Sequence, residues 1–499
     1  MAVCSLAFLF FCAAVSIVYH LAPGKWLRQL ILACASGLFL APLVPDLRSW
    51  VWFAVALAGT YVALVLVRAR PRGRVVVAAV TLVLLLYLYL KRYRLLAEFI
   101  PFEIIPFPLA WDMRLHPVEL VGLSYMAFKI IHMLVDQWQG QLAPFNLWTY
   151  LNYQLSFFTL TAGPIQRYND FLRYWEEIDL KPSDMRESLL FWIRILTGMI
   201  KVGLIGAYTE SVFHSAAGLH RTSSDALTVF YAFPIYLYFN FSGYTDIVLG
   251  AAGLLGFRLP ENFNRPWLAR NVLDFWDRWH MSLTHWIRDY VFMASYKVAA
   301  TNFPSAARYW GYVLLFLAMF LACVWHGATD GFVIFGVLNG LGAAATRVYG
   351  DVLRATLGRS GLHAYMHNRT VRIFAIMINL HYVGVSLLFF NSDINRAQAI
   401  LRGAVREIAH LPTTVFTYSW EGMPVAIEIA LLLFVLVLLT AAWKFDAFSV
   451  FIARLALRFS TRNGWLLTIL CVQCAIVVEM FFFDWAFQQE PPPVLYMAF

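Results

Sequence analysis

Long apolar runs recur along almost the whole chain, and they restrict its solvent more than any other feature of the sequence. Each run approaches the length that crosses the ~30 Å hydrocarbon core of a bilayer. We expect spans near residues 2–21, 27–44, 50–67, 75–90, 118–135, 148–163, 188–208, 225–256, 309–325, 328–349, 370–390, 424–443 and 463–483. Because some of these are half-spans, we predict an all-α polytopic membrane protein with roughly ten to twelve transmembrane helices, plus re-entrant or interfacial helices.

The composition supports lipid as the main solvent. Hydrophobic residues make up 61% of the chain and charged residues 13%, whereas soluble domains carry about 25% charged residues. The net charge of +9 is explained by arginine-rich cytoplasmic loops such as the one that carries Arg68, Arg70, Arg72 and Arg74. We therefore expect no nucleic acid among the partners, and a chain that spans the inner (cytoplasmic) membrane many times.

The connectors between the runs are too short for a soluble domain, so we expect residues 1–499 to form a single membrane-embedded domain. Within it, 1–117 supply the N-terminal spans, 118–350 the catalytic core and 351–499 the C-terminal spans. The longer connectors are 91–117, 164–187, 257–308, 350–369 and 391–422. Residues 257–308 differ from the rest because they are polar, charged and rich in tryptophan.

That connector contains NFNRPWLARNVLDFWDRWHMSLTHWIRDYVF, residues 262–292. Asn271 is placed to cap a helix that begins at Val272, and Asp274 lies in its first turn, where the helix dipole favours a negative charge. Asp274 and Arg278 are spaced to pair across one helical turn. We expect the same helix to carry Trp276, Trp279, His280 and Trp286. The competing interpretation is an interfacial helix with solvated charges and anchoring tryptophans.

A second histidine stands in CVWHGATDGFVIFGVLNG, residues 323–340. His326 lies between two apolar runs, and an ionisable residue at membrane depth indicates a functional site. Since burial disfavours the imidazolium, we expect His326 to stay neutral and able to accept a proton. The alternative is a core histidine bonded to a neighbouring carbonyl.

Two further stretches carry polar groups in apolar surroundings. In residues 122–136, Lys129, His132 and Asp136 are spaced to share one helix face. In residues 161–171, Gly163 and Pro164 are expected to end a helix beside other protein or a cavity. We favour structural roles for both stretches.

Taken together, these stretches resemble the membrane-bound O-acyltransferase family, in the branch of alginate O-acetyltransferase and the teichoic-acid D-alanyl transfer protein. The resemblance rests on GLSYMAFKIIHMLVD, TAGPIQRYNDF, YFNFSGYTDIVLGAAGLLGFRLPENFNRPW, DFWDRWHMSLTHWIRDYVF, VWHGATDGFVIFGVLNG and VLYMAF, in the family's order. It implies that His326 and His280 lie on a central tunnel through the protein, with His326 catalytic and His280 either catalytic as well or only shaping the tunnel. Further tunnel candidates are Trp279, Ser282, Trp325 and Asn339. Tyr382 and Asn391 depart from the Trp and Arg usual in the family's later span.

The resemblance also implies the partners. An activated acyl donor, acetyl-CoA or an acyl-carrier thioester, enters from the cytoplasm as a co-substrate, and no cofactor is bound tightly. The acceptor is a hydroxyl of an extracytoplasmic polysaccharide or teichoic-acid-like polymer, the acyl group is acetyl or D-alanyl, and accessory membrane or periplasmic subunits assist.

Two other functions compete with acyl transfer. Lys129, His132, Asp136 and His326 would suit a proton relay in a secondary transporter or flippase for an envelope precursor. His280, His285 and His326 would be the ligands of an intramembrane metalloenzyme, although their spacing matches no H-E-x-x-H pattern. We therefore expect no metal, and the favoured hypothesis is an O-acyltransferase with histidine general-base catalysis.

Overall fold

The computed structural model describes residues 3–44, 47–91, 121–178, 185–218, 224–327, 329–390 and 394–417. In these ranges every extended regular element is a helix, and one isolated antiparallel bridge joins Phe263 to Trp279. The described chain divides into two compact units. The first runs to Leu204 and takes in Phe241–Glu261, and the second comprises Ile205–Asn240 and the chain from Asn262 onward.

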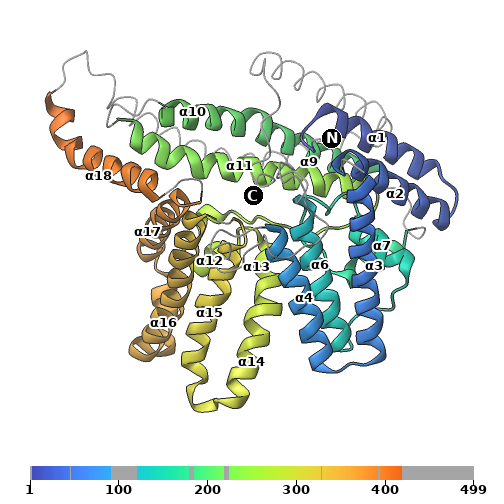
Figure 1. The fold of residues 1–499 in the computed structure, drawn as a ribbon. Helices are drawn as coiled ribbons and strands as arrows, with labels where there is room; N and C mark the ends of the chain where they lie inside the picture. Colours follow the sequence, from blue (N-terminus) through green and yellow to red (C-terminus); the bar gives the residue numbers. More distant parts are fainter. Residues whose placement is uncertain are drawn as a thin grey trace. The chain divides into compact units, whose positions relative to one another are not determined.

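The elements up to the long helix α11 are coloured blue to green in Figure 1. They are α1 (Leu6–Leu21), α2 (Lys25–Leu40), η1 (Ala41–Leu43), α3 (Leu47–Ala69), α4 (Gly73–Lys91), α6 (Val121–Trp138), α7 (Leu147–Leu155), α8 (Tyr168–Glu176), α9 (Met185–Ile200), the π-helical η3 (Lys201–Gly206), α10 (Ala207–Gly218) and α11 (Ser224–Leu254). Helix α11 contributes its first half to the second unit and its second half to the first unit.

The second unit continues with short elements and then long helices. They are η4 (Pro266–Leu268), α12 (Val272–Trp276), α13 (Met281–Ile287), the π-helical η5 (Arg288–Phe292), α14 (Met293–Asn302), η6 (Pro304–Ala306), α15 (Ala307–Val324), α16 (Asp330–His367), α17 (Arg369–Leu388) and α18 (Ile394–Thr417). Helices α14, α15 and α16 lie side by side (Figure 1).

Among the described residues, four helical stretches are long and apolar enough to cross a bilayer. They are Glu187–His214, Pro304–Val324, Asp330–His367 and Arg369–Leu388. They support the predicted integral membrane protein and the all-helical class. The expected ten to twelve spans remain a prediction, and the spans expected at 424–443 and 463–483 lie outside the described residues.

Three boundaries differ from the sequence-based expectations. The connector expected at 350–369 is mostly helical, because α16 runs to His367 with an interruption at Gly358, whose φ of +63° and ψ of −172° are not helical. The connector expected at 391–422 is largely α18. Both helices carry charged side chains, so neither appears in the sequence as an uninterrupted apolar run. The span expected at 148–163 ends as a helix at Leu155, before the predicted break at Gly163.

A side chain of helix α18 also caps the N-terminus of α11. The carboxylate of Glu407, itself buried, accepts hydrogen bonds from the backbone N–H groups of Ala226 and Leu227, each at 3.2 Å. The first N–H groups of a helix have no partner within the helix, and a carboxylate there also complements the helix dipole. Glu407 therefore satisfies α11 from a distant part of the chain.

In the first unit, the buried Lys129 joins α6 to the end of α7 and to the chain that follows it. Its Nζ donates to the carbonyls of Tyr153 at 3.0 Å and Gln154 at 3.3 Å, and to Thr159 Oγ1 at 2.7 Å. An ammonium has three N–H donors, so these three oxygens match its full capacity. The arrangement supports the structural role expected for Lys129.

His132 continues this polar cluster from the same face of α6. Its Nδ1 lies 3.2 Å from Asp136 Oδ2 and its Nε2 lies 2.7 Å from the hydroxyl of Tyr153. That hydroxyl donates to the carbonyl of Gln166 at 2.6 Å. The predicted shared face is confirmed, and the contacts tie α6 to α7 and to the chain after Gly163.

Helices α9 and α11 approach closely at glycines within the first unit. A Cβ added to Gly243 would lie 2.6 Å from the carbonyl oxygen of Gly198, and a Cβ added to Gly198 would lie 2.5 Å from the carbonyl oxygen of Gly243. Small residues permit this backbone contact between membrane helices.

We predict that Gly243→Ala lowers the midpoint of thermal unfolding in detergent, because the methyl group forces the two backbones apart. Overpacking of this kind costs about 1–3 kcal/mol. Gly203→Ala is the matched control, since a Cβ at Gly203 would meet nothing within 4 Å. Equal midpoints for the two variants would contradict the close contact.

Candidate functional site

The two histidines singled out in the sequence lie together in the second unit. His280 has no exposed surface and His326 is 3% exposed. Their ring centroids are 6.4 Å apart and the ring planes meet at 46°. Because two imidazoles are thus held out of water within reach of one small substrate group, this pair is the candidate active site.

The backbone at His280 is unusual. Asn271 caps α12 at Val272 as predicted, accepting from the N–H of Asp274 at 2.9 Å. The expected continuous helix is wrong, however, because α12 ends at Trp276 and His280 is in the left-handed region, with φ +46° and ψ +51°. This conformation costs roughly 1–2 kcal/mol for a side chain with a Cβ, although histidine is among the types that adopt it more often.

A short antiparallel pairing surrounds this turn. The isolated bridge joins Phe263 to Trp279, and the N–H of Asn264 donates to the carbonyl of Arg278 at 2.9 Å. The Phe263 and Trp279 rings also meet edge to face, with centroids 5.1 Å apart. The chain before η4 therefore fixes the segment that carries His280.

Aromatic side chains surround His326 at the end of α15. Trp325 and Phe390 lie edge-on to its ring, with centroids at 4.8 Å and 5.4 Å. Phe390 in turn contacts Phe332 and Phe335 of α16, at 5.1 Å and 5.3 Å. Phe390 could not be predicted from the sequence, because a phenylalanine at the end of an apolar run has no distinguishing neighbour.

Burial sets the charge of His280. Loss of hydration disfavours the imidazolium and lowers the pKa of His280 to about 3. The ring is therefore neutral across the physiological range. A neutral imidazole has one nitrogen that accepts a proton or a hydrogen bond and one that donates.

The other candidate residues lie around the pair in different ways. Trp279 stacks on Phe275, with centroids 5.5 Å apart. The amide of Asn339 accepts from Trp276 Nε1 at 3.0 Å and donates to the carbonyl of Phe335 at 2.9 Å. Asn339 thus holds α12 against α16. The predicted tunnel remains a prediction.

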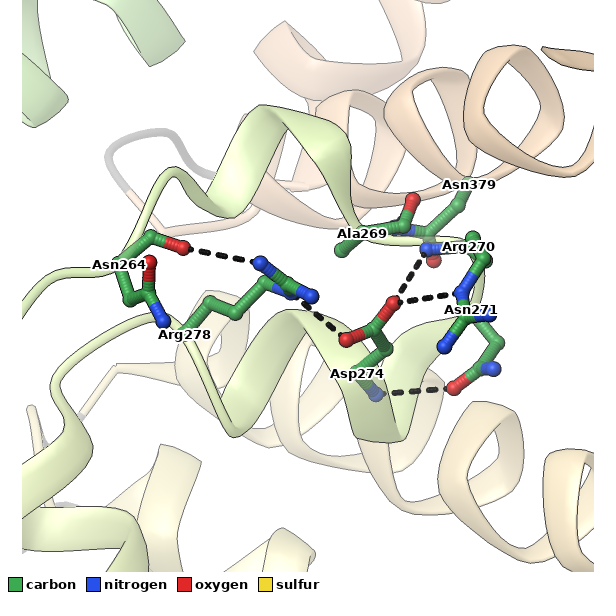
Figure 2. A network of polar contacts seen from close by, with 7 residues as sticks. All are labelled: Asn264, Ala269, Arg270, Asn271, Asp274, Arg278 and Asn379. Atoms are coloured by element: carbon green, nitrogen blue, oxygen red, sulfur yellow. Dashed lines mark hydrogen bonds and ion pairs between the residues drawn. The ribbon is translucent and has the colours of Figure 1, made fainter. Parts of the chain in front are cut away.

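Figure 2 shows the charged network that supports α12. Asp274 accepts from Arg278 Nε at 2.7 Å, and its second oxygen accepts from the backbone N–H and the Nε of Arg270 at 3.0 Å and 3.2 Å. The predicted pair of Asp274 and Arg278 is confirmed. Burial raises the pKa of Asp274, but the hydrogen bonds from both arginines outweigh it and hold the pKa below its usual value.

The network continues on both sides of the carboxylate. Arg278 also donates to the carbonyl of Asn264 at 3.3 Å, and Asn379 of α17 donates to the carbonyl of Ala269 at 3.2 Å (Figure 2). Asp274 and Arg278 therefore connect α12 to Asn264 before η4 and to Arg270 after it. In the parts of the chain that the structure describes, no group of three or more His, Cys, Asp or Glu side chains gathers as a metal site would require.

The comparisons with known proteins cover this region. The model of the MBOAT, membrane-bound O-acyltransferase, family matches residues 76–388, a range that contains both histidines. A teichoic acid D-alanyltransferase of Bacillus subtilis is 31% identical over 60% of this chain and 76% of its own length. That of Streptococcus thermophilus is 27% identical over 56% and 69%. A protein named probable alginate O-acetylase from Pseudomonas aeruginosa is 31% identical over 47% and 44%.

We predict that Asp274→Asn lowers the midpoint of thermal unfolding at neutral pH, since hydrogen bonds to charged groups contribute about 1.5–3 kcal/mol each. A carboxyl whose pKa is lowered by folding stabilises above its unfolded pKa of about 3.9 and loses this effect as the pH falls through the folded pKa. The difference between wild type and variant should therefore shrink below about pH 4. Asp277→Asn, at an exposed position, is the control and should leave the midpoint unchanged.

A second prediction concerns His280 and pH. In the unfolded chain, the His280 imidazole takes up a proton below about pH 6.5, whereas in the folded protein it stays neutral down to about pH 3. The free energy of unfolding should therefore decline by up to about 1.4 kcal/mol for each pH unit between these two values. His280→Asn, which tolerates the left-handed turn, should make unfolding less dependent on pH. Chemical unfolding at pH 4.5 and 7 measures this, with the exposed His214→Asn as control. An unchanged slope would contradict the burial of a neutral ring.

Proposed function

The chain belongs to the membrane-bound O-acyltransferase family, and on this premise we propose that it moves an acetyl or D-alanyl group from a cytoplasmic thioester to a hydroxyl of an extracytoplasmic envelope polymer. Acyl transfer is the activity in the names of its relatives. The observation that carries the proposal is the pair of buried imidazoles, His280 and His326, 6.4 Å apart.

The chemistry needs one group that takes a proton from the acceptor. We assign this role to His326. Its neutral imidazole removes the proton from the acceptor hydroxyl as the hydroxyl oxygen forms a bond to the thioester carbonyl carbon. The C–S bond then breaks, and the departing thiolate receives the proton from the imidazolium. General-base assistance of this kind contributes about 10²–10⁴-fold.

His280 is proposed to act beside His326. A neutral ring so close cannot repel the imidazolium that forms at His326, and it offers a donor or an acceptor to the hydroxyl or to the carbonyl oxygen. The aromatic surroundings of His326 exclude water, which would otherwise compete with the acceptor for the thioester.

The donor, acceptor and location follow from the same premise. We propose acetyl-CoA or an acyl-carrier thioester as the donor, and a polysaccharide or a teichoic-acid-like polymer as the acceptor. The protein would act in the inner membrane, with accessory membrane or periplasmic subunits. The named relatives include both a D-alanyltransferase and an O-acetylase, so both acyl groups are tested below.

The alternatives receive less support. The transporter hypothesis joined Lys129, His132 and Asp136 to His326 as a proton relay. Lys129 instead contacts three oxygens of the chain around α7, and the family match favours acyl transfer.

We predict that His326→Ala abolishes ester formation on the envelope polymer, with a loss of at least about 100-fold, because the variant lacks the proposed general base. Mass spectrometry of envelope glycans from producing cells measures the ester, and its mass identifies the acyl group. His363→Ala, at an exposed position of α16, is the matched control and should retain full ester content. A folded His326→Ala variant with wild-type ester content would disprove the mechanism.

A further inference from the structure

Asn262 contacts the turn of His280 through both its main chain and its side chain. It has no exposed surface. Its carbonyl oxygen accepts from the N–H of Met281 at 3.0 Å, and its Oδ1 accepts from the N–H of Ser282 at 3.2 Å. These are the first two N–H groups of α13, directly after His280.

This arrangement replaces the usual helix cap. The residue before a helix commonly satisfies an early N–H group with its own side chain, but the side chain of His280 makes no such bond to α13. Asn262 supplies the acceptor from 20 residues earlier. With the bond from Asn264 to Arg278, hydrogen bonds secure the chain on both sides of His280.

A left-handed residue with a Cβ persists only where its surroundings hold it. The ring direction of His280 follows from that backbone, because Cβ leaves the chain in a direction set by φ and ψ. Loss of the hydrogen bonds from Met281 and Ser282 to Asn262 therefore changes where the His280 imidazole lies relative to His326.

The choice of asparagine also fits the charge of the site. Aspartate would cap α13 equally well, but its carboxylate would favour the imidazolium of a nearby histidine. The amide offers an acceptor without a charge. It does so at a cost, because Nδ2 of Asn262 is buried and has no hydrogen-bond partner among the described residues.

We infer that Asn262 is a positioning residue, whose amide oxygen holds the turn that aims the His280 imidazole at the acyl-transfer site beside His326. The inference rests on the proposed function and adds to it a residue that touches neither substrate. The catalytic pair would then depend on a third residue from the chain before η4.

The test measures acyl transfer in membranes that contain the full chain and its acceptor polymer. Radiolabelled acetyl-CoA, or radiolabelled D-alanine with ATP and the cell's carrier fraction, is supplied, and whichever labels the wild-type polymer is used throughout. We expect Asn262→Ala to lower kcat by about 10- to 100-fold, because displacement by about 1 Å can cost that much. The apparent KM for the donor should stay within about twofold, since donor binding does not involve Asn262.

Two further variants separate positioning from folding. Asn262→Gln keeps the amide but moves its oxygen by one methylene group, and it should also lose activity. Asn262→Asp keeps the acceptor oxygen and should recover more activity as the pH rises, because its charge favours the imidazolium at low pH. A folded Ala or Gln variant with wild-type kcat would overturn the inference, as would an Asp variant that matches Ala at every pH.

The controls distinguish an error in the positioning role of Asn262 from an error in the proposed function. Asn368 is the ordinary cap of α17, and its amide oxygen accepts from the N–H groups of Thr370 and Val371 at 2.9 Å and 3.1 Å. Asn368→Ala should therefore lose a cap and keep its kcat. If His326→Ala is inactive while a folded Asn262→Ala is fully active, only the positioning role is wrong. If His326→Ala is as active as wild type, the proposed function itself fails and the inference falls with it.

Discussion

Desolvation is the constraint on which the site depends. An imidazole that water cannot reach stays neutral, because the surrounding protein does not compensate the lost hydration of the cation. Burial lowers the pKa of His280 to about 3 and keeps its ring neutral, and His326 lies equally protected from water, with its ring centroid 6.4 Å away. Under the proposed function, the same exclusion of water would protect a reactive thioester from hydrolysis.

The support for this site comes from a polar connector between long helices. Residues 257–308 form short helices with turns between them. Asn262 and Asn271 accept hydrogen bonds from backbone N–H groups of these helices, and the N–H of Asn264 donates to the carbonyl of Arg278. Asp274 and its two arginines add charged bonds that hold α12. A rigid backbone of this kind places buried side chains more accurately than a mobile loop would.

Local features could be predicted from the sequence, whereas distant pairings could not. The cap at Asn271, the pair of Asp274 and Arg278, and the contact of His132 with Asp136 follow from helix geometry within four residues. The break at His280 depends on the pairing with residues 262–264, and the contact with Phe390 depends on how α15, α16 and α17 pack. Neither leaves a periodic signal. The lengths of α16 and α18 were missed because charged residues interrupt the apolar pattern within both helices.

The contact of Glu407 with the first turn of α11 has a consequence for the order of synthesis. The acceptor lies 181 residues after Ala226, and a ribosome adds about 5–20 residues per second. For roughly ten to forty seconds, the nascent α11 must leave these N–H groups to water or to lipid headgroups. Completion of this helix is therefore a late event in biogenesis, after α12 to α17 have emerged.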